Sequence, residues 1–290
     1  MIKIMDDQGS KDRVFSFEFF PPRTPEGRDK LRATWQRLSE LNPHFFSVTF
    51  GASGSDQSGT LETVREIQRH SGIDTAPHLT CIGSSRVRIR EILERYLATN
   101  IRRIVALRGD FPPDMTEMGE FRYANELVAF IRAETGNDFH IEVAAYPEFH
   151  PAAPSASMDL ENFKRKVEAG ADSAITQYFY NQDAYLRFVD SCNRIGVRIP
   201  IVPGIMPITN YVSLARFSER CGAEIPRWLA KRLEGFGDNM DALQAFGIDV
   251  VTELCHRLLE AGAPGLHFYV LNRAEPVATI WKNLGLSKIP

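Results

Sequence analysis

The chain has 290 residues, of which 43% are hydrophobic, and its formal net charge at pH 7 is −3. This length suits one large domain or two small ones, with enough apolar residues for a sizeable core. Acids and bases are mixed along the chain without a basic stripe or a block of like charge, which argues against a nucleic-acid partner and against a charged tail.

Three further features concern where the protein works. The N-terminal segment 1–13 is polar and acidic, unlike a signal peptide, and no apolar run reaches the length of a membrane span. The four cysteines lie far apart without a C-x-x-C motif, as expected for reduced thiols rather than for disulfides or a zinc site. We therefore expect a soluble cytoplasmic protein that has no membrane partner.

Strand-like and helix-like segments alternate along the chain. Strands are expected, in order, at 13–20, 45–50, 76–81, 102–107, 140–146, 173–179, 199–205 and 265–271. Helical periodicity marks 25–41, 60–72, 89–97, 123–135, 157–170, 182–196, 240–262 and 274–285. The stretch between the seventh and eighth strands is long, irregular and largely helical.

Eight strand–helix units in a chain of this length predict an α/β fold with a parallel sheet, and we expect a (β/α)8 TIM barrel. A doubly wound sheet is the rival fold, but no G-x-G-x-x-G motif follows any strand and there is no P-loop. Without a linker or low-complexity segment, the expected organisation is a single catalytic domain over 1–290 with a short polar N-terminal extension at about 1–12.

Active sites of such barrels lie at the carboxyl ends of the strands, so the last residues of each strand are the first candidates. Polar side chains gather there, at the ends of strands that are otherwise apolar. They are Glu18, Thr49, His78, Arg108, Asp110, Tyr146, Glu148, His150, Gln177, Asn272 and Arg273.

The first strand shows how such a residue is oriented. Phe15, Phe17 and Phe19 alternate with Ser16 and Glu18, so the phenylalanines should face the helices while Glu18 points into the barrel mouth. Desolvation should then raise the pKa of Glu18 toward the range of a general acid. The alternative is a glutamate held in a structural ion pair with an arginine.

Other candidates also have two interpretations. Asp110 is either a site carboxylate or a plain turn residue, while Gly109 before it would let the backbone approach a ligand closely. His78 is equally a core histidine or a ligand contact, and Gln177 could bond a heterocycle or tie down a loop. Glu148 and His150 are a weak metal signal, and we expect no metal.

Donors for a cofactor phosphate are offered by the helix at 157–170. Asp159, Asn162 and Lys166 are spaced three and four residues apart on one face, with Arg165 beside them. The alternative is an ordinary solvated helix face.

Nine motifs, taken together, resemble the methylenetetrahydrofolate reductase family in its short bacterial form. They occur in the family's order between about Val14 and Leu284. The motifs are "SFEFFPPR", "SVTFGA", "APHLTC", "ALRGD", "AAYPEFHP", "FKRKVEAGA", "AITQYFY", "PGIMP" and "FYVLNRAE". Each alone is weak, but nine in order are highly specific.

The resemblance implies a (β/α)8 barrel that binds FAD without a Rossmann motif. It also implies NADH or NADPH as the reductant, and ping-pong hydride transfer through the flavin to 5,10-methylenetetrahydrofolate. The product would be 5-methyltetrahydrofolate, which feeds methionine synthesis. The family further suggests a homo-oligomer, often a tetramer.

The resemblance also implies residue roles. Glu18 matches the general acid that opens the folate's five-membered ring, and Asp110 matches an aspartate beside flavin and pterin. Gln177, Phe217 and Arg273 match folate contacts, and Ser213 stands where the family pattern has a glutamine. The positions that match the flavin site are Thr49, His78, Arg108, Gly109, Asp110, Tyr146, His150, Asp159, Asn162, Arg165 and Lys166.

Two rival functions remain from the residues alone. A Schiff-base aldolase needs a lysine at a strand end, which is absent, and a metal-assisted aldolase would have to use Asp110, Glu148 and His150. A barrel that has lost catalysis and serves as an interaction module is the other rival. A flavin spectrum of the purified protein separates all three.

Overall fold

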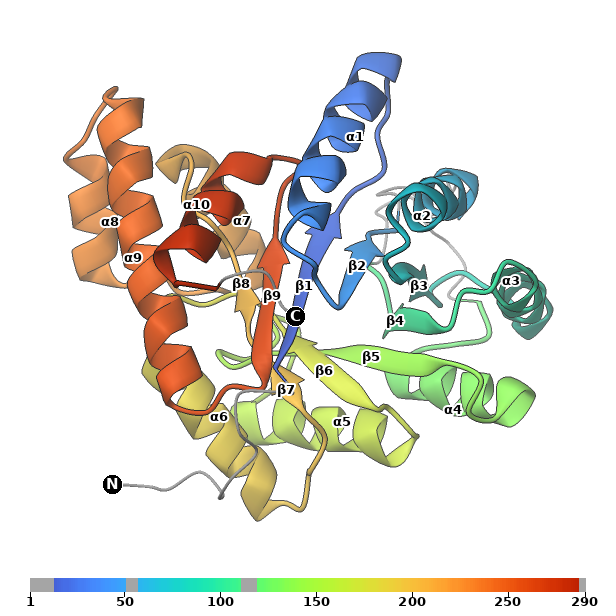
Figure 1. Ribbon diagram of the computed structural model, residues 1–290. Coiled ribbons are helices and arrows are strands. Elements are labelled where there is room, and N and C mark those ends of the chain that lie inside the picture. Colours follow the sequence, from blue (N-terminus) through green and yellow to red (C-terminus); the bar gives the residue numbers. More distant parts are fainter. Residues whose placement is uncertain (1–12, 51–56, 111–118, 287–290) are drawn as a thin grey trace.

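Parallel strands form one sheet at the centre of the molecule. A computed structural model describes residues 13–50, 57–110 and 119–286. The strand segments are β1 (Val14–Phe19), β2 (Phe45–Val48), β3 (Thr75–Thr80), β4 (Arg103–Leu107), β5 (His140–Ala145), β6 (Ser173–Thr176), β7 (Ile201–Val202), β8 (Gly204–Ile205) and β9 (Gly265–Tyr269). Their order in the sheet is β7-β6-β5-β4-β3-β2-β1-β9-β8. The sheet curls into a barrel, as the alternation predicted (Figure 1).

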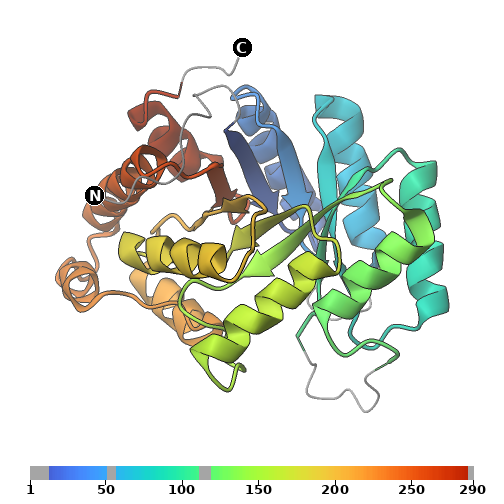
Figure 2. The same cartoon turned by 90° about the horizontal axis from the view of Figure 1, so that it is seen from below.

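Helices surround this barrel (Figure 1; Figure 2 shows it from below). They are α1 (Pro25–Ser39), α2 (Gln57–Ser71), α3 (Arg86–Ala98), α4 (Ala124–Thr135), α5 (Ala156–Glu168), α6 (Gln182–Arg194), α7 (Tyr211–Cys221), α8 (Arg227–Glu234), α9 (Met240–Glu260) and α10 (Ala274–Asn283). The irregular stretch expected before the last strand is thus three helices, α7 to α9. The N-terminal extension expected at 1–12 lies outside the described residues.

The barrel closes where the seventh strand is split. The sequence predicted one strand over 199–205, but β7 pairs with β6 while β8 pairs with β9, on either side of Pro203. Proline has no N–H to donate. Its carbonyl accepts instead from the backbone N–H of His267 (3.0 Å), and the next N–H, of Gly204, donates to Oγ1 of Thr176 (2.9 Å). A Cβ at position 204 would lie 2.1 Å from the carbonyl oxygen of Thr176, so only glycine fits.

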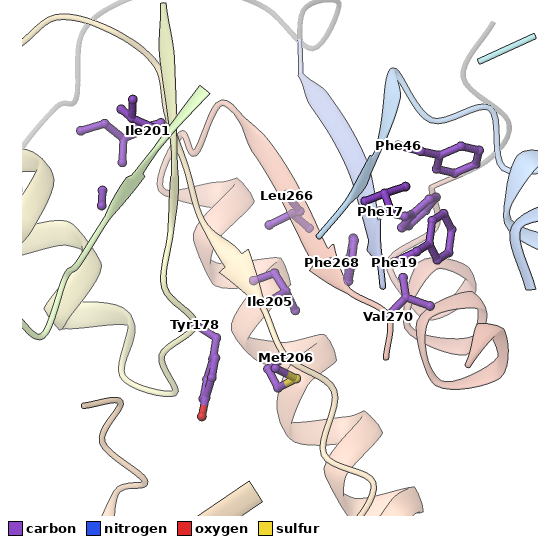
Figure 3. Close-up of a cluster of buried hydrophobic side chains, with 14 of the residues drawn as sticks. Phe17, Phe19, Phe46, Tyr178, Ile201, Ile205, Met206, Leu266, Phe268 and Val270 are labelled. Carbon is purple, nitrogen blue, oxygen red and sulfur yellow. The ribbon is translucent and has the colours of Figure 1, made fainter. Parts of the chain in front are cut away.

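The alternation expected in β1 is confirmed. Phe15, Phe17 and Phe19 are buried in the apolar layer between the barrel and the helices. The rings of Phe15 and Phe17 lie 5.1 Å and 5.6 Å from that of Trp281 on α10. Figure 3 shows Phe17 and Phe19 gathered with Phe46 on one side of β1 and β2. Alternate residues of β1 therefore face the barrel interior, which sets the direction of Glu18.

The amino end of the barrel is filled by a buried ionic cluster. The guanidinium of Arg103 donates to Oε1 of Glu142 (2.6 Å) and lies over the ring of Phe45, 4.5 Å from its centroid. Ser173 donates to the other carboxylate oxygen of Glu142. Because every strand runs away from this end, the carboxyl ends of the strands are left for the site. Among the described helices, none is long and apolar enough to cross a membrane.

Candidate active site

Glu18 lies between two histidines at the carboxyl end of β1. Its Oε2 atom is 3.3 Å from Nε2 of His78 on β3 and 3.4 Å from Nε2 of His267 on β9. Burial acts to raise the pKa of Glu18, but the two imidazoles oppose it by charge and hydrogen bonding and lower this pKa to about 2. The expectation that desolvation would raise this pKa is therefore wrong, because the charge-stabilising partners outweigh burial. Among the described residues, the ion-pair partners of Glu18 are histidines, and none is an arginine.

A serine completes this group from inside the barrel. Nδ1 of His267 lies 2.7 Å from Oγ of Ser16, and both side chains are fully buried. The register of β1 against β9 places Ser16 opposite His267 and Glu18 opposite Tyr269. Sequence analysis did not identify Ser16 and His267 as site residues. The alternation along β9 could have indicated His267, since His267 and Tyr269 share one face of the strand and the apolar residues Leu266 and Phe268 share the other.

The end of β4 supplies Arg108, Gly109 and Asp110. Nε of Arg108 donates to the carbonyl of Gly109 (3.1 Å), and Gly109 has φ of +87°. A Cβ on Gly109 would lie 2.9 Å from Cγ2 of Ile82 and 3.0 Å from Cβ of Thr80. Both the φ angle and the tight space require glycine here. Asp110 is exposed and is the last described residue before the gap at 111–118.

Residues after β5 adjoin that group. The rings of Tyr146 and His150 are 4.6 Å apart, and the backbone N–H of His150 donates to Oδ2 of Asp159 (3.0 Å). Burial raises the pKa of Tyr146 to about 12, and the charge of Asp110 adds to this effect. Burial also lowers the pKa of His150, helped by the charge of Arg108. The charges of Asp110 and Arg108 after β4 therefore act on Tyr146 and His150 after β5, so the ends of these two strands lie close together.

A helix face with amide and cationic groups lies beside it. On α5, Arg165 donates to Oδ1 of Asn162 (3.2 Å), and the guanidinium of Arg165 is half exposed. Nζ of Lys166 donates to the carbonyl of Ala144 on β5, and burial lowers the pKa of Lys166 to about 8. A cavity of about 670 Å³ borders Tyr146 and is lined by residues of α5, α6 and α7, but not by Asn162, Arg165 or Lys166.

Two more candidates, Gln177 after β6 and Phe217 on α7, both contact Tyr178. Gln177 accepts the backbone N–H of Tyr178 through Oε1 (3.1 Å). The ring of Phe217 stacks on Tyr178, with centroids 5.9 Å apart and planes inclined by 11°, and Phe217 remains 42% exposed. The hydroxyl of Tyr178 is fixed by Oγ of Ser218 at 2.8 Å. A rigid aromatic pair with one open ring can pack against a planar ligand.

The remaining candidates lie at the rim or turn away from the site. The backbone N–H of Thr49 donates to the carbonyl of Phe19 (2.9 Å), which ties the ends of β1 and β2 together, and Arg273 is exposed directly before α10. Glu148 instead accepts the backbone N–H of Glu224 after α7 (2.8 Å). Within the described residues, no group of three histidine, cysteine, aspartate or glutamate side chains is arranged to hold a metal ion.

Comparisons with known proteins agree with this architecture. The family model "Methylenetetrahydrofolate reductase" matches residues 3–285. The chain is 42% identical to the 5,10-methylenetetrahydrofolate reductases of Pectobacterium carotovorum over 276 residues and of Escherichia coli over 273 residues, covering 93% of this chain and 90% of each relative. It is 41% identical over 298 residues to an Arabidopsis thaliana relative named methylenetetrahydrofolate reductase (NADH) 1, of which it spans 50%.

A solved structure shares the fold at low sequence identity. It is described as an uncharacterized protein from Clostridium thermocellum that binds two copies of 5-methyl-5,6,7,8-tetrahydrofolic acid. The TM-score is 0.66 at 16% identity, with 96% of this chain and 94% of the other covered, which supports the barrel fold alone. The family match and the relatives go further: the chain belongs to the methylenetetrahydrofolate reductase family and carries its 5,10-methylenetetrahydrofolate reductase activity.

Proposed function

We propose that this reductase works by ping-pong hydride transfer through bound FAD, with NADH or NADPH as reductant and 5,10-methylenetetrahydrofolate as acceptor. The observation that carries the proposal is the carboxylate of Glu18, held between His78 and His267 at the mouth of the barrel. A proton source there is what ring opening of this folate needs. The product, 5-methyltetrahydrofolate, would feed methionine synthesis.

The residues at the ends of β4 and β5 fit a flavin cofactor. Arg108, Asn162, Arg165 and Lys166 offer cationic and amide donors of the kind that bind a pyrophosphate. Gly109 lets this segment pack tightly against Thr80 and Ile82, which fixes Arg108 and Asp110 on either side of it. When bound, FAD supplies the hydride chemistry, while the protein binds, orients and shields the reactants.

Further residues complete the proposed cofactor site. Asp110 would be the carboxylate beside the flavin and the pterin, and its charge acts on Tyr146 and His150. Asp159 fixes the backbone at His150, and Thr49 fixes the end of β2. These contacts hold the end of β2 and the segment after β5 in place before a ligand binds, which reduces the ordering cost of binding.

Glu18 acts on the folate through its proton. Protonation of a ring nitrogen breaks one C–N bond of the five-membered ring, and the carbon left behind becomes part of an iminium that accepts hydride. Because the two imidazoles lower the pKa of Glu18, this carboxyl must take up a proton before it can act as the acid. Nε2 of His267 lies 3.4 Å from Oε2 of Glu18, so His267 is placed to return a proton to Glu18 after each turnover.

Three residues would bind the folate. Phe217 offers an open aromatic face, Gln177 an amide for the heterocycle, and Arg273 a cation for a carboxylate. His78, which the resemblance places in the flavin site, has Nε2 directed at Glu18 and so would connect the two regions.

The proposal is tested by anaerobic spectroscopy of the purified protein. It should carry or take up FAD, NADH or NADPH should bleach the flavin absorbance, and 5,10-methylenetetrahydrofolate should restore it. A protein that cannot be reconstituted with FAD would sink the proposal. The rates with NADH and with NADPH identify the preferred reductant.

We also propose that the protein is a homo-oligomer, with a tetramer as one form. Val212 on α7 and Trp228 on α8 are exposed apolar side chains of the kind that subunit contacts cover. Sedimentation equilibrium should give a multiple of the 32.7 kDa chain mass. A monomer at all concentrations would contradict this.

A further inference from the structure

Two consecutive residues after β9 have an unusual backbone. Leu271 and Asn272 both have φ of +53°, in the left-handed region. Residues with a Cβ avoid this region, and asparagine tolerates it better than leucine. Such residues persist where the surrounding structure fixes them, and they concentrate at functional sites. The turn that they form leads directly to Arg273.

Hydrogen bonds fix this turn to the end of β1. The side chain of Asn272 accepts the backbone N–H of Phe20 through Oδ1 (3.1 Å) and donates through Nδ2 to the carbonyl of Phe20 (2.9 Å). Thr34 of α1 donates to the carbonyl of Asn272 (3.1 Å). The backbone N–H of Arg273 donates to the carbonyl of Val270 (3.1 Å).

The side chain of Asn272 continues the ladder between β1 and β9. These strands lie side by side and parallel (Figure 1), with Glu18 opposite Tyr269 as the last pair. The backbone N–H of Val270 donates to the carbonyl of Glu18 (3.2 Å). Beyond that point the chain turns, so backbone pairing stops. An amide both donates and accepts, and Asn272 therefore supplies one more rung, at Phe20.

The residues around this rung face outward at the barrel mouth. Phe20 and Leu271 are 45% and 43% exposed, and Arg273 is exposed as well. Exposed apolar residues do not require a strained turn for stability. The arrangement instead holds Arg273 at a fixed place relative to Glu18, two residues before Phe20 on β1.

We propose that Asn272 is a positioning residue, which fixes Arg273 against the end of β1 so that the folate is held with its ring nitrogen at Glu18. This inference rests on the proposed function, in which Arg273 binds the folate and Glu18 protonates it. The proposed flavin contacts lie on β3 and α5 and after β2, β4 and β5, and none of the bonds of Asn272 reaches them. Loss of the rung should therefore affect the folate half-reaction and spare the nicotinamide half-reaction.

The test compares three variants with the wild-type holoenzyme. Asn272→Gly keeps the left-handed backbone accessible but removes both bonds to Phe20. Asn272→Asp keeps the acceptor for the N–H of Phe20 and loses the donor. Asn100→Gly is the matched control, since Asn100 also has positive φ (58°) but follows α3 at the other end of the barrel.

Stopped-flow spectroscopy measures each half-reaction. Two neutral hydrogen bonds at about 1 kcal/mol each predict that Asn272→Gly raises the folate concentration at half-maximal rate roughly 10- to 30-fold, with a smaller rise for Asn272→Asp. Flavin reduction by NADH or NADPH should stay within about twofold of wild type, as should both half-reactions of Asn100→Gly.

A double-mutant cycle shows whether Asn272 acts through Arg273. In an Arg273→Ala background, Asn272→Gly should add little further loss, because the cation that it positions is absent. Full additivity would overturn the proposal, and so would equal slowing of both half-reactions or an equal effect of Asn100→Gly. A wild-type flavoenzyme that folate cannot reoxidise would refute the proposed function itself, and the positioning role with it. If the wild type turns over folate and the Asn272 variants do so at the same rates, only the positioning role is refuted.

Discussion

Replacing His267 by phenylalanine should raise the pKa of Glu18. The ring of His267 already lies 6.2 Å from that of Phe45, at an angle of 27°, so a second aromatic ring suits this position. The change removes the donor 3.4 Å from Oε2 of Glu18 and leaves His78 in place. It also leaves the buried hydroxyl of Ser16 without its partner, so Ser16→Ala is made alongside it.

The size of the effect follows from the lost contact. A hydrogen bond to a charged group is worth about 1.5–3 kcal/mol, and one pKa unit corresponds to about 1.36 kcal/mol. The pKa of Glu18 should therefore rise by about one to two units from its value of about 2. Burial, which acts to raise this pKa, is less opposed once a single imidazole remains.

Difference infrared spectroscopy across a pH series measures the change. The carboxylic acid band of Glu18 is assigned by its loss in Glu18→Gln, and it should appear at higher pH in Ser16→Ala/His267→Phe than in wild type. Ser16→Ala alone keeps the contact between His267 and Glu18 and should shift the band much less. An unchanged titration of Glu18 in the double variant would refute the account of how its charge is stabilised.

Three further predictions concern the same mouth. Asp110→Asn removes a negative charge from the proposed flavin site. The folate half-reaction should slow, and the flavin's reduction potential, measured by dye equilibration, should rise. If neither changes, Asp110 is a plain turn residue. Gly109→Ala brings a Cβ within 2.9 Å of Ile82 at φ of +87°, so the free energy of unfolding in urea should fall by roughly 1–3 kcal/mol, with weaker FAD binding by fluorescence titration. Retained stability and binding would contradict this close approach. The lowered pKa of Glu18 contributes stability above its ordinary value of 4.5 that is lost as pH falls toward about 2. Over that range, wild type should lose up to about 3 kcal/mol of unfolding free energy relative to Glu18→Gln, and parallel urea-unfolding curves at each pH would contradict it.

Much of the fold was accessible from local sequence patterns. Alternation in β1 predicted which side chains face the helices, because the period of a strand is fixed at two residues. The split of the seventh strand was not predicted. It depends on Pro203 meeting Thr176 on β6 and His267 on β9, which only the closed barrel brings together.

The composition of the site was more predictable than its electrostatics. The strand-end rule selected Glu18 and His78, whose side chains meet in the structure, since parallel strands finish at one rim. The predicted direction of the pKa shift was wrong because it depends on His78 on β3 and on His267, which is 249 residues away in sequence. Burial can be anticipated from neighbours along a strand, but charge partners across a barrel require the register of β1 against β9. The turn at Asn272 was also not predicted, because its hydrogen bonds to Phe20 depend on the pairing of β1 with β9.

The most direct test of the account is stopped-flow kinetics of Glu18→Gln in each half-reaction. Flavin reduction by NADH or NADPH needs no proton on the folate, so its rate should be retained. Reoxidation by 5,10-methylenetetrahydrofolate should slow by roughly 10²- to 10⁴-fold, the usual contribution of general acid catalysis. If the variant is reoxidised as fast as wild type, Glu18 is not the acid, and if both halves slow alike its role is structural.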